Sequence, residues 1–125
     1  MEEYLRRKID KYLLDWKANP GHKPLIIKGA RQVGKTKSIQ QFANKNYESV
    51  VEINFAEEPT FKQIVENGYS PEAVIQNISR IRIGVKFIPH KTLIFFDEVQ
   101  EFPDVTTSLK FFAQDGRFDV ICSGS

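Results

Sequence analysis

Eight consecutive residues near the amino terminus have the types and spacing of a phosphate-binding loop. The segment reads GARQVGKT and fits the pattern G-x-x-x-x-G-K-[ST]. In such a loop, backbone N–H groups at the start of a helix surround phosphate oxygens, the lysine reaches the β- and γ-phosphates, and the last hydroxyl coordinates Mg²⁺. The predicted phosphate-binding residues are Gly29, Ala30, Arg31, Gln32, Val33, Gly34, Lys35 and Thr36.

The residues on either side of this loop fit the strand and the helix that it needs. An apolar run predicts a buried strand near residues 25–28, and residues 37–43 have apolar side chains at helical spacing. Gly29 and Gly34 allow a tight turn and a close approach to phosphate. The alternative is an ordinary turn with an exposed lysine, and the flanking strand and helix favour the phosphate loop.

A second group of residues with suitable chemistry follows an apolar run at residues 93–96. The run predicts a parallel strand at residues 92–97, buried on both faces and ending in Asp97 and Glu98. Open α/β sheets bind ligands at the carboxyl ends of their strands. We therefore expect Asp97 to hold Mg²⁺ and Glu98 to polarise an attacking water molecule, the arrangement called Walker B.

A third signal, weaker than the other two, lies at the carboxyl end of the sequence. Residues 118–123 predict a strand that leads into Ser123-Gly124-Ser125. A serine at the tip of this strand could orient the attacking water or contact the γ-phosphate. An ordinary turn explains the same residues equally well, and the sequence does not decide whether Ser123 or Ser125 would act.

Strands and helices alternate along the chain. Besides the strands above, residues 49–55 predict a strand, and helices are expected at residues 2–17, 59–66, 71–81 and 106–114. This alternation predicts an α/β fold in which helices cover both faces of a parallel sheet.

Three segments in this order, GARQVGKT, FFDEVQ and ICSGS, resemble prokaryotic AAA+ ATPases. The resemblance covers essentially the whole sequence and implies a P-loop NTPase three-layer sandwich with sheet order 5-1-4-3-2. Family members generally continue into a fifth strand, a helical lid and an arginine finger. Residues 1–125 therefore resemble the N-terminal portion of a AAA+ nucleotide-binding domain, with a leading helix at 1–18, an incomplete P-loop core at 25–125, and strand 5 and the lid missing.

The predicted function is binding of ATP or ADP and Mg²⁺-dependent hydrolysis of ATP. Thr36 and Asp97 would hold Mg²⁺, and the catalytic residues would be Lys35, Glu98 and one of Ser123 and Ser125. Without the lid and finger, we expect these residues alone to be weakly active or inactive. A non-catalytic nucleotide-binding fragment or interaction module is the alternative. A small-molecule kinase is disfavoured, because Glu98 would activate water where a kinase must exclude it.

Composition limits the classes of partner and the location. The net charge of +2 is too small to support nucleic acid binding. Cys122 is the only cysteine and cannot form an internal disulfide, and no segment approaches the roughly 18 apolar residues of a membrane span. We therefore expect a cytoplasmic protein, with exposed histidines at His22 and His90 and no metal site there. Homo-oligomers are expected through the bare edge of the first strand or through ring contacts.

Overall fold

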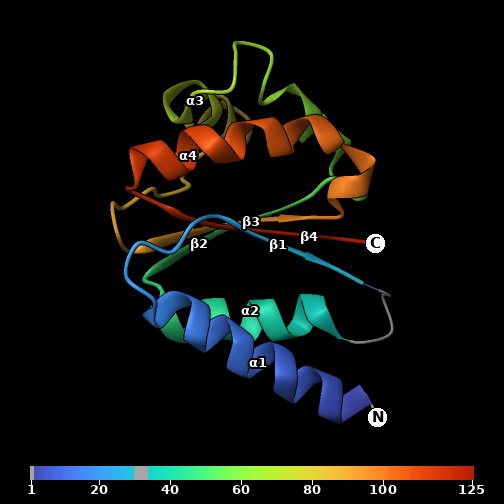
Figure 1. The fold of residues 1–125 in the computed structure, drawn as a ribbon. Helices are drawn as coiled ribbons and strands as arrows, with labels where there is room; N and C mark the ends of the chain where they lie inside the picture. Colours follow the sequence, from blue (N-terminus) through green and yellow to red (C-terminus); the bar gives the residue numbers. More distant parts are fainter. Residues whose placement is uncertain (1, 30–33) are drawn as a thin grey trace.

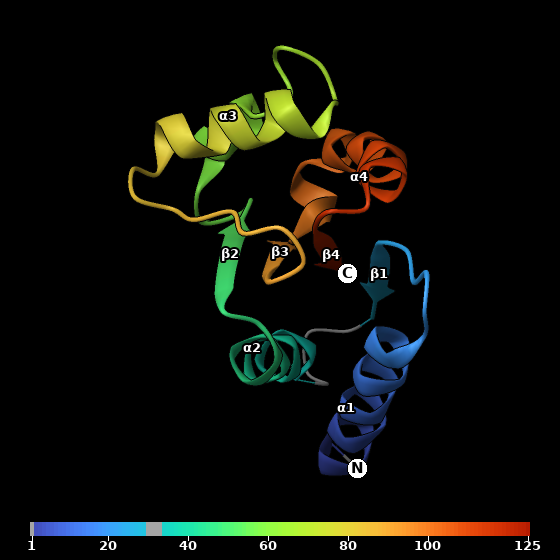
Figure 2. The ribbon, with the colours of Figure 1, turned by 90° about the vertical axis from the view of Figure 1, so that its left-hand side faces the viewer.

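Four parallel strands form the middle layer of the structure. The computed structural model describes residues 2–29 and 34–125, and within them the strands are β1 (Leu25–Lys28), β2 (Ser49–Asn54), β3 (Thr92–Asp97) and β4 (Asp119–Gly124). They pair in the order β1-β4-β3-β2, all parallel (Figure 2). The predicted parallel sheet is confirmed, and its order is that of the resembled family without a fifth strand.

Helices cover both faces of this sheet, which confirms the three-layer α/β prediction. On one face lie α1 (Glu2–Ala18) and α2 (Lys35–Asn46), and on the other lie α3 (Pro71–Ile81) and α4 (Leu109–Asp115) (Figure 1). Three short 3₁₀ helices, η2 (Pro59–Gln63), η3 (Val99–Glu101) and η4 (Pro103–Ser108), complete the described elements. The carboxyl ends of β1 and β4 and the start of α2 lie at the same side of the molecule (Figure 1).

The central strand β3 supplies apolar side chains to both layers, and all six of its residues are buried. Leu93 and Phe95 pack in the cluster that includes α1 and α2, whereas Ile94 and Phe96 pack in the cluster that includes α3 and α4. Successive side chains of a strand point to opposite faces, so a continuous apolar run is what a strand covered on both faces requires.

Two predicted helices differ from the structure. Residues 59–66 were expected to be a helix, but only Pro59–Gln63 is helical, and it is 3₁₀. Two core side chains, Phe61 in η2 and Ile64 directly after it, are three residues apart, the repeat of a 3₁₀ turn. The predicted helix at 106–114 begins earlier, as the 3₁₀ helix η4. In this segment the hydroxyls of Thr106 and Ser108 donate hydrogen bonds to backbone carbonyls three residues before them, and α4 follows.

The edge of the sheet at β1 is uncovered among the described residues. β1 pairs only with β4, and Ile26 is 43% exposed. This is the bare edge that the sequence predicted. No helix in the described part of the chain is long and apolar enough to cross a membrane.

A polar network closes the opposite end of the sheet, where the strands begin. Asp119 accepts hydrogen bonds from the hydroxyl of Tyr47 at 2.6 Å and pairs with His22 Nε2 at 2.8 Å. His22 also stacks edge-on against Trp16, with ring centroids 4.7 Å apart. The prediction that His22 is exposed was therefore wrong, because its ring is enclosed by a carboxylate and an indole. His90 is exposed, as predicted.

We expect Tyr47→Phe to lower the free energy of unfolding by roughly 1.5–3 kcal/mol, because it removes a hydrogen bond to a charged group. Burial, with help from Asp119, raises the pKa of Tyr47 above its ordinary value of 10.0. Above pH 10.0 the folded state therefore retains a proton that the unfolded state loses, so this stabilisation falls as the pH rises further.

Denaturant unfolding at pH values from neutral to about 11 measures both effects. The matched control is Tyr12→Phe, since Tyr12 is 55% exposed. Equal losses in the two variants, or a difference from wild type that does not shrink at high pH, would contradict the prediction.

Candidate functional site

A cleft of about 670 Å³ opens at the carboxyl ends of the strands. Its lining comes from the start of α2, from the end of β2 and the residues after it, and from the end of β3. The lining residues are Gly34, Lys35, Thr36, Lys37, Gln40, Asn54, Ala56, Glu57, Asp97 and Glu98. The fold thus brings together Lys35, Thr36, Asp97 and Glu98, which sequence analysis placed in two separate segments. The cleft is where open parallel sheets bind ligands.

Gly34 gives the chain its turn into α2. Its φ of 71° is in the left-handed region, which glycine adopts without strain. The space around it is also restricted, since a Cβ at this position would lie 2.9 Å from Cδ of Arg6 in α1. The first turn of α2 therefore begins at the cleft, where its N–H groups favour an anion.

The other predicted residues of the loop are placed only in part. Gly29 follows β1, and its N–H donates to the carbonyl of Gly124 at 3.2 Å. The remaining four, Ala30, Arg31, Gln32 and Val33, lie outside the described residues, so their contacts with phosphate stay a prediction.

Lys35 is held between the ends of two strands. Its side chain is 4% exposed, and its ammonium donates to the carbonyl of Gly29 and, at 2.7 Å, to that of Gly124. A buried ammonium needs such acceptors, because burying it without partners is costly. These two bonds hold the charge beside the cleft and leave the third N–H of the ammonium for a phosphate oxygen.

Thr36 and Asp97 are in direct contact across 61 residues of sequence. The hydroxyl of Thr36 donates to Oδ2 of Asp97 at 3.0 Å, and the N–H of Glu98 donates to Oδ1 at 2.8 Å. Asp97 is 3% exposed, and burial raises its pKa, while these two hydrogen bonds act in the opposite direction. The contact joins the two side chains that the sequence assigned to Mg²⁺.

The oxygens of this pair fit a magnesium ion. Mg²⁺ is usually held by one or two carboxylates together with substrate phosphates and water, not by a closed protein cage. In the described part of the chain, no group of three or more His, Cys, Asp and Glu side chains could hold a metal. A hydroxyl beside a single carboxylate would supply two of the Mg²⁺ ligands, and phosphate oxygens and water would supply the others.

Glu98 has an unusual backbone conformation. Its φ of 56° and ψ of 46° are left-handed, which is uncommon for a residue with a side chain. Such conformations persist where neighbouring contacts hold them, and they cluster at functional sites. One of those contacts is a hydrogen bond at 3.0 Å from Nε2 of Gln100 to Oε2 of Glu98.

Neither candidate serine lines the cleft. Ser123 is fully buried in β4 beside Ile27, and its hydroxyl finds no hydrogen-bond partner among the described residues. Ser125 is exposed and borders a separate hollow with Ile26 and Lys28 of β1. An unpartnered buried hydroxyl is rare, which makes Ser123 the more suitable of the two for a polar role.

Sequence reasoning missed two polar residues next to the predicted ones. Gln40 of α2 lines the cleft and donates to Glu52 of β2 at 2.8 Å, and burial raises the pKa of Glu52. Asn54 ends β2, and its side-chain oxygen accepts from the N–H groups of Ala56 and Glu57. The only available signal was polarity inside a predicted strand and helix, which does not identify a partner.

Comparison with known proteins adds three findings. A family model described as "AAA domain" matches residues 21–125, which is most of the chain. The search of curated proteins returns no match. A solved structure, that of PCH-2 from C. elegans, is similar over 98% of this chain, with 16% sequence identity and a TM-score of 0.48, and the chain spans 35% of that protein's chain.

Proposed function

Because the chain belongs to the AAA domain family, we propose that it binds ATP with Mg²⁺ in the 670 Å³ cleft and hydrolyses the bond between the β- and γ-phosphates, giving ADP and phosphate. The observation that carries the proposal is the 3.0 Å contact between the hydroxyl of Thr36 and the carboxylate of Asp97, directly beside Lys35. A nucleotide-binding, ATPase-like module is what the family supports, and the finer assignment of residues rests on this geometry.

Each residue has a role that its chemistry and position support. Lys35 would bind the β- and γ-phosphate oxygens, and the first turn of α2 would add N–H donors. Thr36 and Asp97 would hold Mg²⁺, which neutralises phosphate charge and orients the phosphates when bound. Glu98, at the rim of the cleft, would accept a proton from the attacking water, and Ser123 is the better candidate for a polar contact at the tip of β4.

Lys35→Ala tests the binding part of the proposal. The variant loses the cation at the mouth of the loop, so we expect ATP affinity to fall by roughly 1.5–3 kcal/mol, or about tenfold to a hundredfold. Isothermal titration calorimetry with MgATP measures the change. Lys45→Ala, an exposed lysine in the same helix, is the matched control. Equal affinities of Lys35→Ala and wild type for MgATP would contradict the assignment of residues 29–36 as a phosphate-binding loop.

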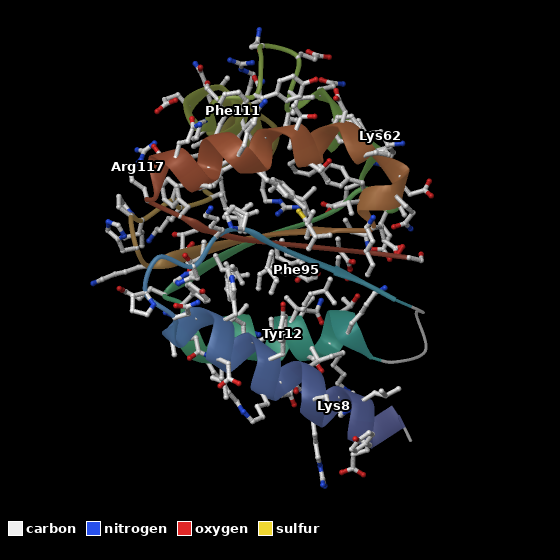
Figure 3. The ribbon with its side chains drawn as sticks, in the orientation of Figure 1. Lys8, Tyr12, Lys62, Phe95, Phe111 and Arg117 are labelled. Atoms are coloured by element: carbon white, nitrogen blue, oxygen red, sulfur yellow. The ribbon has the colours of Figure 1, made fainter. Side chains whose placement is uncertain are left out.

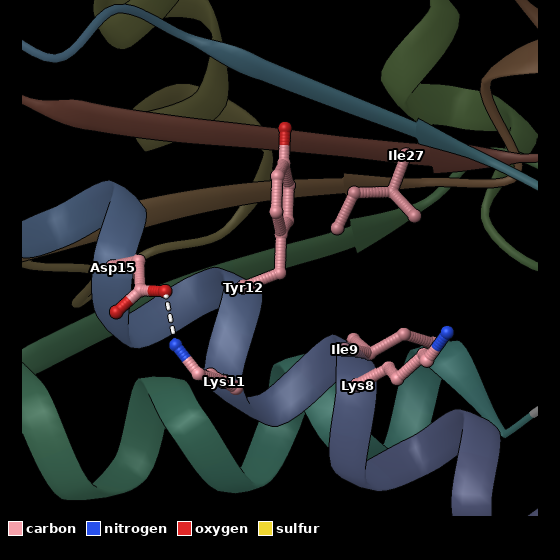
Figure 4. A pocket seen from close by; sticks show the side chains of 6 residues that line it. All are labelled: Lys8, Ile9, Lys11, Tyr12, Asp15 and Ile27. Atoms are coloured by element: carbon pink, nitrogen blue, oxygen red, sulfur yellow. Dashed lines mark hydrogen bonds and ion pairs between the residues drawn. The ribbon is translucent and has the colours of Figure 1, made fainter.

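Oligomerisation is typical of AAA proteins, and we propose that in this chain it uses the edge of β1. An unpaired strand edge can hydrogen-bond a strand of another molecule. Two hollows flank this edge. One, of about 460 Å³, lies on the α1 side and is lined by Ile9, Tyr12 and Ile27 among others (Figure 4). The other, of about 320 Å³, lies on the opposite face and includes Ile26.

We expect wild-type protein to associate in a concentration-dependent manner in sedimentation velocity experiments. Ile26→Lys should weaken this association, because a lysine on an edge strand disfavours pairing with another chain. Ile83→Lys, at a side chain that is 91% exposed, makes the same change away from the edge and should leave association unaltered. Monomeric wild-type protein at all accessible concentrations would contradict the proposal.

A further inference from the structure

The side chain of Gln100 joins the acidic end of β3 to the end of β4. It belongs to η3, two residues after Glu98. Its Nε2 donates to Oε2 of Glu98 at 3.0 Å, and its Oε1 accepts from the N–H of Ser125 at 3.2 Å. One amide therefore contacts two segments that are more than 20 residues apart in sequence.

An amide can make both of these hydrogen bonds at neutral pH, because it carries a donor and an acceptor on one planar group. A carboxylate side chain would accept from Ser125 but repel Glu98, and an ammonium could donate but not accept. The opposite orientation of the amide is also excluded, since it would set Oε1 against the Glu98 carboxylate and an NH₂ group against the N–H of Ser125. The contact therefore requires a side chain that both donates and accepts, and it fixes the orientation of the Gln100 amide.

Gly124 provides the space for this contact. A Cβ at residue 124 would lie 2.7 Å from Oε1 of Gln100 and 3.1 Å from Cγ2 of Val99. The backbone of Gly124 is not in the left-handed region, so its lack of a side chain, and not its conformational freedom, is what the site uses. The close approach of η3 to the backbone therefore explains why a residue without a side chain lies between Ser123 and Ser125.

We propose that Gln100 is a positioning residue that fixes the carboxylate of Glu98 for its role with the attacking water. The inference rests on the proposed ATP hydrolysis. Glu98 is held in a left-handed conformation, and a general base must be placed within a few tenths of an ångström of its productive position. The hydrogen bond from Gln100 ties that carboxylate to the end of β4. Gly124 in β4 also accepts a hydrogen bond from Lys35.

Gln100→Met keeps the length of the side chain and removes both hydrogen bonds. We expect the single-turnover rate of MgATP hydrolysis, measured with protein in excess, to fall about tenfold to a hundredfold, as for loss of one hydrogen bond to a charged group. The Kd for MgATP should change by less than about twofold, since the amide acts on the base and not on the phosphates. Gln114→Met, at an exposed glutamine of α4, is the matched control.

A double-variant comparison separates positioning from a general structural effect. If Gln100 acts through Glu98, Gln100→Met should have no further effect on the rate in a Glu98→Gln background. Gln100→Glu adds a pH test. Its new carboxyl can donate only when protonated, so its rate relative to wild type should rise as the pH is lowered from about 8 toward about 5. A structural defect would show no such recovery.

Several results would overturn the inference. They are an unchanged rate in Gln100→Met, a rate loss matched by an equal loss of MgATP affinity, and an equal further loss in the Glu98→Gln background. A wild-type rate no higher than that of Glu98→Gln would also overturn it, because there would be no base to position. Failure of the proposed function is distinguishable, since it appears as MgATP binding that does not depend on Lys35.

Discussion

Glu98→Gln should lower the rate of MgATP hydrolysis by about 10²–10⁴-fold, the contribution typical of a positioned general base. The amide cannot accept the proton of the attacking water, yet its oxygen can still accept the hydrogen bond from Gln100. Nucleotide binding should be retained, with a Kd for MgATP within about twofold of wild type, because the proposed role of Glu98 concerns the attacking water and not the binding of the nucleotide. Single-turnover hydrolysis and calorimetry measure the two quantities on the same protein.

Glu101→Gln is the matched control for that variant. It removes the same charge three residues further along, within η3, but Glu101 is exposed and is not among the residues that line the cleft. Its hydrolysis rate should equal that of wild type. If Glu98→Gln hydrolyses ATP as fast as wild type, the proton acceptor is another group and the role of Glu98 must be reassigned.

The largest expected effect on stability comes from Phe95→Ala. Phe95 is completely buried in β3, between the sheet and the layer of α1 and α2 (Figure 3). Removing its ring leaves a cavity, and such truncations cost about 3–5 kcal/mol. Since domains are typically stable by only about 5–15 kcal/mol, we expect a large fall in the denaturant midpoint or an unfolded protein.

Phe111→Ala makes the same change at the surface of α4, where the ring is only partly buried (Figure 3). It should cost much less than Phe95→Ala, and urea unfolding of both variants tests the difference. Similar midpoints for the two variants would mean that the centre of the sheet is not the main source of stability.

The strands and the end of the sheet that holds the cleft could be predicted because their signals are local. The apolar run ending in Asp97 predicts a buried parallel strand, and the predicted bounds at 25–28 and 92–97 match β1 and β3. The sequence assigned Thr36 and Asp97 to the same Mg²⁺ ion from two separate motifs, and the structure places them in contact because the carboxyl ends of parallel strands meet at one edge. The sheet order came from the family resemblance and not from any periodicity.

What could not be predicted depends on register between distant segments. Asp119 and His22 are 97 residues apart, and nothing in either neighbourhood identifies the other. The contacts of Gln100 could not be predicted for the same reason. Its sequence position after Asp97 and Glu98 was visible, but its contact with Ser125 requires knowing that η3 lies against the end of β4. The 3₁₀ segments were missed because a short apolar pattern does not distinguish a repeat of three from one of 3.6.

The polar network of His22, Tyr47 and Asp119 lies where strands begin, whereas the cleft lies where they end. Strands of four to six residues span about 13–20 Å, a separation at which free-energy effects of substitutions usually add. Protein engineers could therefore raise the stability by redesigning the first end, and the added stability would allow destabilising substitutions around the cleft at the other.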